Sequence, residues 1–119
     1  MEDRREHKRE SLAPFVELFP EDGAAPVSGY PTDMSRGGLA LEADDPLPLG
    51  AKVNVGVHFD PVVADGVETG DAPVEFVGAH VVRVAQMGKR HKISVGFDDL
   101  SEADHPLLWG VLSFIERGR

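Results

Sequence analysis

Apolar and polar residues alternate along several segments of the chain, which is the pattern of half-buried β-strands. The clearest run covers residues 51–59, and residues 92–98 repeat the pattern. The apolar face of the first run consists of Val53, Val55, Val57 and Phe59. Shorter strands are expected at residues 12–19 and 39–42, and a longer one at residues 74–87.

Segments that favour turns separate the expected strands. Loops rich in Gly, Pro, Ala or Asp are expected at residues 20–32, 44–50 and 60–73, and a tight basic turn at residues 88–91. Inside the longest strand the alternation slips near Gly78, which predicts a bulge or bend at that residue.

The apolar period changes near the C-terminus. Apolar side chains recur there at helical spacing, at Leu107, Leu108, Val111, Leu112 and Ile115. Pro106 suits a first helical turn, so the helix is expected to begin near His105 with Asp104 as its cap. Antiparallel strands followed by one helix predict a mostly β fold, in which a small barrel packs against the helix.

Composition narrows the class of protein. The 119 residues suit one domain, and the absence of cysteine excludes disulfides and thiolate chemistry. No apolar run approaches the roughly 20 residues that span a bilayer. The charged start of the chain does not have the pattern of a secretory signal. We therefore expect a cytoplasmic protein without a membrane segment.

The net charge of −9 argues against a binder of nucleic-acid polymers, because their sequence-independent affinity comes from Lys and Arg. The basic residues form two local clusters, which are Arg4, Arg5, Lys8 and Arg9, and then Lys89, Arg90 and Lys92. Residues 1–11 have no apolar periodicity, so we expect a flexible arm. A basic arm on an acidic body suits a compact anion, although such charge runs are often only solvated tails.

Two short motifs lie before the expected strand at residues 39–42. Arg5 and Arg9 form R-x-x-x-R, and Asp33, Ser35 and Gly38 form D-x-S-x-x-G directly before an apolar strand. Each motif alone carries little information, because D-x-S-x-x-G is a common turn sequence and arginine pairs are frequent in charged termini. In this order, and with a barrel pattern after them, they resemble the PilZ family of cyclic di-GMP receptors.

The resemblance spans nearly the whole chain and implies a stand-alone domain. Residues 1–11 would form a flexible basic arm that carries the first motif. Residues 12–119 would form a six-stranded antiparallel barrel, split or Greek-key-like, with the C-terminal helix. The family is one of receptors, so no enzymatic activity and no cofactor are expected.

The resemblance also implies a cyclic di-GMP site, made of Arg4, Arg5, Arg9, Asp33, Ser35, Gly37 and Gly38. Arginine can donate two hydrogen bonds to a guanine edge or to phosphate, and Asp33 can accept from guanine N1–H and N2–H. Ser35 can donate to phosphate. Gly37 and Gly38 would allow close backbone approach, positive φ and a nest of N–H groups for an anion.

Three neighbouring residues refine these expectations. Lys8 stands where family members often have proline. A basic residue at the position of Arg4 accompanies paired ligand molecules in the family, which favours two ligands per protomer and a homodimer. The stoichiometry and the oligomeric state stay open. Arg36, at a variable motif position, is expected to contact phosphate or to face water.

The expected function is a cyclic di-GMP receptor whose arm becomes ordered on binding and which signals to an unidentified protein target, in motility or exopolysaccharide regulation. One alternative is an interaction module of the same fold that does not bind nucleotide. Another is an RNA-binding barrel that uses the arm and residues 89–92. The five histidines lack metal-ligand spacing, and Ser35 lacks a neighbouring base, so metal and nucleophilic chemistry are not expected.

Overall fold

The computed structural model describes residues 14–59, 62–64, 67–69 and 73–117. The expected arm of residues 1–11 lies outside this part of the chain. The elements in chain order are β1 (Phe15–Pro20), β2 (Val27–Gly29), β3 (Pro31–Ser35), β4 (Gly38–Ala43), β5 (Lys52–His58), β6 (Val62–Ala64), β7 (Val67–Thr69), β8 (Val74–Met87), β9 (Arg90–Phe97) and α2 (Pro106–Arg117).

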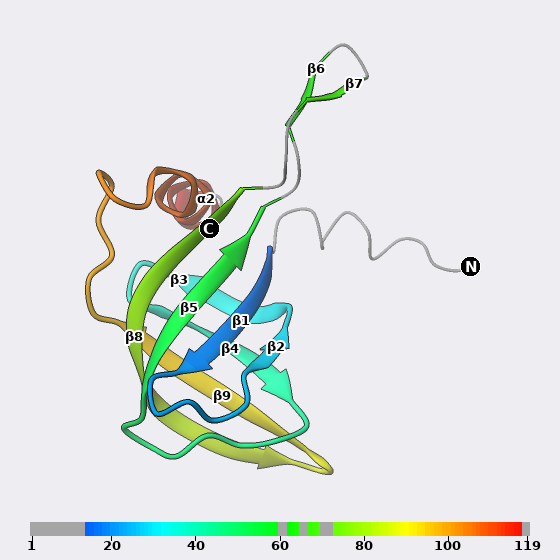
Figure 1. Cartoon of the computed structure of the whole chain (residues 1–119), viewed down its shortest axis with the longest axis vertical. Coiled ribbons are helices and arrows are strands. Elements are labelled where there is room, and N and C mark those ends of the chain that lie inside the picture. The colour runs from blue at the N-terminus through cyan, green and yellow to red at the C-terminus, as the bar shows by residue number, and fades with distance from the viewer. Residues whose placement is uncertain (1–13, 60–61, 65–66, 70–72, 118–119) are drawn as a thin grey trace.

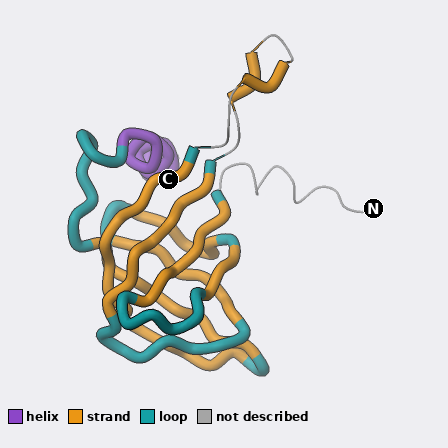
Figure 2. The backbone as a smooth tube through the Cα atoms, in the orientation of Figure 1, coloured by secondary structure: helices purple, strands orange, loops and turns teal. Residues whose placement is uncertain are grey.

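One antiparallel sheet with the strand order β2-β1-β5-β8-β9-β4-β3 curls into a barrel (Figures 1 and 2). Its two edge strands, β2 and β3, are consecutive in the chain with only Tyr30 between them. β2 pairs with β1, and β3 pairs with β4, so one bent segment joins both ends of the sheet. The predicted mostly β barrel with a C-terminal helix is confirmed, and it is six-stranded when this segment is taken as one strand.

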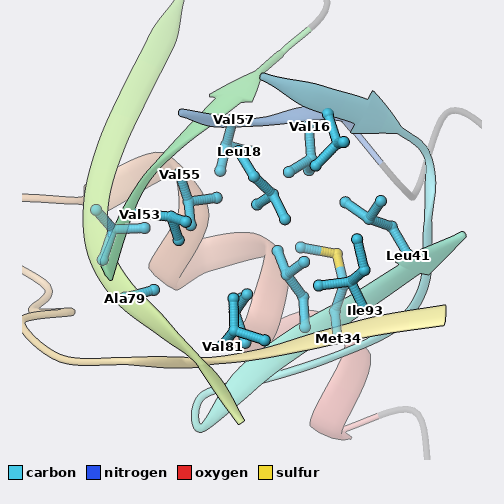
Figure 3. Close-up of a cluster of buried hydrophobic side chains, with 14 of the residues drawn as sticks. Val16, Leu18, Met34, Leu41, Val53, Val55, Val57, Ala79, Val81 and Ile93 are labelled. Carbon is cyan, nitrogen blue, oxygen red and sulfur yellow. The ribbon is translucent and has the colours of Figure 1, made fainter. Parts of the chain in front are cut away.

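The core follows from the alternation of apolar residues. Val53, Val55 and Val57 of β5 are fully buried, as the sequence pattern predicted. They lie beside Val16 and Leu18 of the neighbouring strand β1, and all five side chains point into the barrel interior (Figure 3). Leu108 and Leu112 of α2 belong to the same buried cluster, so the helix covers one end of the barrel (Figure 1).

Two expected loops contain short strands. The segment 20–32 includes β2 and the start of β3, and the segment 60–73 includes the β6–β7 hairpin. The prediction of a loop at residues 20–32 was wrong in this respect, because backbone pairing with β1 and β4 makes strands of residues that lack a long alternating pattern. Residues 60–73 were expected to be a long hairpin loop, and they do join β5 to its antiparallel partner β8, but they contain a short hairpin of their own.

The bulge in β8 lies after Gly78 rather than at it. Gly78 pairs regularly with Asn54, and the register shifts between Val81 and Arg83. The Gly78 N–H donates to Asp99 Oδ1 at 2.8 Å, and a Cβ at this residue would lie 3.4 Å from both carboxylate oxygens, at the edge of ordinary contact. Val81 is buried, and at the bulge the next two residues, Val82 and Arg83, are both exposed.

Glu75 of β8 caps the helix, and the expected cap by Asp104 was wrong. Because α2 begins at Pro106, Asp104 lies one residue before the capping position. The Glu75 carboxylate accepts from the N–H groups of Leu107 at 2.9 Å and Leu108 at 2.8 Å. A negative charge at a helix N-terminus is favourable, so β8 fixes where α2 starts.

His105 makes a second link between the helix and β8. Its side chain is buried, with Nε2 2.8 Å from the carbonyl oxygen of Phe76. Nδ1 accepts from the N–H of Ser101 at 3.2 Å, which assigns the proton to Nε2. The His105 carbonyl accepts the first helical bond, from Trp109 N–H.

We expect Glu75→Ala to lower the free energy of unfolding by about 1–2 kcal/mol, because it leaves two helix N–H groups without an acceptor, one of them on buried Leu108. Asp104→Ala is the matched control and should change it by less than about 0.5 kcal/mol. Urea denaturation measures both. Equal losses in the two variants would contradict the assignment of the cap.

Candidate functional site

A surface pocket lies on the outside of the barrel, across β3, β4, β8 and β9. Its volume of about 760 Å³ is in the range of small-molecule sites. It is lined by Asp33, Met34, Ser35, Gly37, Gly38, Leu39, Ala40, Val82, Arg83, Ala85, Met87, Lys92, Ser94, Val95 and Gly96. We call it the motif groove, because every residue expected from the second motif lies in its wall.

The structure does not place the first motif. Arg4, Arg5 and Arg9 lie outside the described residues. Their expected approach to Asp33 and Ser35 therefore stays a prediction.

Asp33 is held at the groove by a lysine of β9. Lys92 Nζ lies 3.1 Å from Asp33 Oδ2, with side chains that are 33% and 67% exposed respectively. An ion pair this accessible contributes little to stability. The lysine can therefore move towards an anion while Asp33 keeps acceptor capacity for a donor in the groove.

Two basic residues of the groove, Arg83 and Lys92, were not among the ligand-site residues expected from the sequence, although Lys92 was noted in the second basic cluster. Arg83 of β8 is paired with Ser94 of β9, and Ala85 is paired with Lys92. Arg83 and Lys92 are therefore diagonal neighbours on one face of the hairpin, and both line the groove. They share this face because of the bulge between Val81 and Arg83, so the sequence could have predicted their proximity only if the bulge had been placed there.

Gly38 is required by close packing of the backbone. A Cβ at this residue would collide with the carbonyl oxygen of Val95 in β9, whereas a Cβ at Gly37 would make an ordinary contact with Ser35 Oγ. The close approach at Gly38 is to the backbone of β9, and the expected close approach of the turn to a ligand stays a prediction. The expected positive φ was wrong for both, since among described residues positive φ occurs at other glycines, Gly23, Gly50 and Gly88.

The N–H groups of the β3–β4 turn do not form the expected anion nest. Arg36 N–H donates to Glu116 Oε2 at 3.0 Å, and Gly37 N–H donates to Ser35 Oγ at 3.2 Å. The N–H groups that would bind a phosphate in a nest thus already donate to oxygens of the protein. Because the Ser35 oxygen accepts from Gly37, its own hydroxyl hydrogen is left to donate into the groove.

Arg36 is exposed to water, which is one of its two expected roles, and it also binds the helix. The expected contact with phosphate stays a prediction. Nη2 donates to Ser113 Oγ at 2.9 Å, Nε lies 3.4 Å from Glu116 Oε1, and the guanidinium carbon is 4.9 Å from the centre of the Trp109 ring. Trp109, Ser113 and Glu116 share one side of α2. The turn therefore contacts the groove on one side and the helix on the other.

The second basic cluster is partly neutralised. Arg90 Nε donates to Asp44 Oδ1 at 3.2 Å, and Arg90 Nη2 donates to the carbonyl oxygen of Glu42 at 3.2 Å. These contacts weaken the case for RNA binding at residues 89–92.

A family model described as the PilZ domain matches residues 3–112. The chain belongs to the PilZ domain family. The matched region includes both motifs, although the structure describes only the second. No curated protein matches the sequence.

Solved PilZ structures share the fold. The PilZ domain of CeSA from a cellulose-synthesizing bacterium is 21% identical, with a TM-score of 0.55 over 87% of this chain and 93% of that one. The PilZ domain of Escherichia coli YcgR with c-di-GMP is 18% identical, with a TM-score of 0.61 over 89% and 83%. Bacillus subtilis inhibitor of motility (MotI/DgrA) is 16% identical, with a TM-score of 0.61 over 92% of this chain and 48% of its own.

Other features of the PilZ domain are less informative. A second pocket of about 570 Å³ lies between residues 20–27 and 45–52 and contains no motif residue. Within the described ranges, no cluster of three His, Cys, Asp or Glu could hold a metal ion. None of the described helical residues form a segment long and apolar enough to cross a membrane.

We expect Gly38→Ala to lower the free energy of unfolding by about 2 kcal/mol or more, because the new methyl group can be accommodated only if β4 and β9 separate. Gly37→Ala is the matched control in the same turn and should change it by less than about 1 kcal/mol. Thermal unfolding followed by circular dichroism compares the two. Similar losses would refute the packing role of Gly38.

Proposed function

We propose that this protein is a cyclic di-GMP receptor that performs no catalysis and signals to a protein partner. The observation that carries the proposal is the motif groove, in which Asp33 and Ser35 lie beside Lys92 and Arg83. Membership of the PilZ family supports it, as does the likeness to the PilZ domain of YcgR, whose structure contains c-di-GMP.

Each groove residue has a chemical role in the proposal. Asp33 accepts from the N1–H and N2–H of a guanine, and Ser35 donates to a phosphate oxygen. Lys92 leaves the Asp33 carboxylate for a phosphate, and Arg83 donates to a second phosphate or to a guanine edge. The groove walls also include apolar side chains, Val82 and Met87, that can cover a base.

The arm completes the site. Arg5 and Arg9, with Arg4 beside them, clamp the nucleotide against the groove from outside the described residues. Binding orders the arm on the barrel and thereby changes the surface that a partner meets. The coupling is limited by the difference in ligand affinity between the two arm states.

The setting of the proposal is the bacterial cytoplasm. Among the similar structures, one protein is named an inhibitor of motility, and one comes from a cellulose-synthesizing bacterium. Motility or exopolysaccharide synthesis is therefore the proposed downstream process.

Calorimetric titration with cyclic di-GMP tests the receptor function. We expect saturable binding that Arg9→Ala and Asp33→Ala each weaken by about 2 kcal/mol, which is roughly 30-fold in Kd, because each removes charge-assisted hydrogen bonds. The stoichiometry distinguishes one ligand from two.

Asp44→Ala is the matched control, because Asp44 is an exposed carboxylate paired with Arg90 outside the groove, and it should leave the affinity unchanged. No heat of binding from a folded protein would reject the receptor and favour an interaction module. An equal loss in the Asp44 variant would reject the groove as the site.

A further inference from the structure

The helix α2 has three distinct faces. One face is buried, with Leu108 and Leu112 in the core. A second face binds Arg36, as described above. The third face is exposed and consists of Leu107, Gly110 and Phe114, which we call the outer strip.

The outer strip is apolar, and no described residue covers it. Leu107 is 43% exposed and Phe114 is 56% exposed. The next exposed residue on this side of the helix is Arg117, three positions after Phe114. Two exposed apolar side chains are common on a protein surface, so the case for an interface rests on Gly110 between them and on the charges at the helix ends.

Gly110 has no function within the described chain. A Cβ at this residue would meet nothing within 4 Å, so close packing does not require glycine. Positive φ does not require it either, because Gly110 is not among the described glycines with that conformation. Glycine is, after proline, the least favourable residue inside a helix. It leaves an exposed stretch of helix backbone that no described residue fills.

A second helix packed against the outer strip would contact all three of its residues. Gly110 leaves bare backbone between the side chains of Leu107 and Phe114, so a facing helix can approach closely at that point. The large side chains would then pack on either side of the crossing.

We propose that the outer strip pairs with the outer strip of a second copy of this chain, with the two helices antiparallel about a two-fold axis near Gly110. The strip is self-complementary in this arrangement, because Leu107 of each copy faces Phe114 of the other, as a two-fold interface requires. The proposal does not depend on cyclic di-GMP.

Charges at the two ends of α2 favour a second copy in the antiparallel orientation. Exposed Glu102 and Asp104 precede the helix, and exposed Arg117 ends it. Antiparallel pairing places each Arg117 beside the acidic residues of the other copy, and it also opposes the two helix dipoles. Parallel pairing would place acid beside acid.

Sedimentation equilibrium of the full chain without ligand tests the proposal. The average mass should rise from 12.9 kDa towards twice that value between about 10 µM and 1 mM, the range expected of a small interface. Leu107→Asp and Phe114→Asp should each abolish the rise. Leu49→Asp is the control, because Leu49 is 70% exposed in a turn away from α2, and it should leave the rise unchanged.

Two further variants separate the interface from effects on folding. Gly110→Leu should raise the melting temperature of the monomer, since leucine favours helix, and should abolish the dimer because the helices can no longer approach. Arg117→Asp should weaken the dimer at least tenfold, and adding Asp104→Arg should restore it. Asp104 precedes α2 and Arg117 is its last residue, and the helix alone spans about 16 Å, so rescue requires contact between copies.

A wild-type protein that stays monomeric up to about 1 mM would overturn the proposal. A dimer that survives both aspartate substitutions in the outer strip would also overturn it, since self-association would then use another surface. Failure of the Asp104→Arg rescue would reject the antiparallel orientation that the proposal specifies.

Discussion

The close contact between Gly38 and the Val95 carbonyl is the constraint on which the site depends. It lets the β3–β4 turn lie directly against β9, where the Phe97 N–H donates to the Gly37 carbonyl at 2.9 Å. This position brings Asp33 within reach of Lys92 and sets the wall of the motif groove. A side chain at Gly38 would separate the turn from the groove's other wall.

The same turn connects the groove to α2. Ser35 faces the groove, while the next residue, Arg36, binds Ser113 and Glu116 and covers Trp109. Backbone hydrogen bonds hold the turn on β9, so the two contacts are joined by a short and well-supported segment. Arg36 therefore connects the groove turn with the helix, so a displacement of the turn would change its contacts with Ser113 and Glu116.

Local patterns predicted the fold, and long-range contacts decided what they missed. The alternation in residues 51–59 located β5, and helical spacing located α2, because both signals lie within one element. The cap from Glu75 joins residues more than thirty positions apart, so no pattern near the helix contains it. The place of Arg83 and Lys92 in the groove depends on the register of β8 and β9 after the bulge. The role of Gly38 depends on its packing against β9, the facing strand.

The most direct measurement follows the amide chemical shifts of the nitrogen-15-labelled chain while cyclic di-GMP is added. If the ligand binds the motif groove, the largest changes among the described residues will be at Ser35, Gly38, Arg83 and Lys92, with smaller ones at Trp109 through Arg36. Changes confined to the second pocket, around residues 20–27 and 45–52, or no changes in a folded protein, would contradict the assignment of the groove as the ligand site.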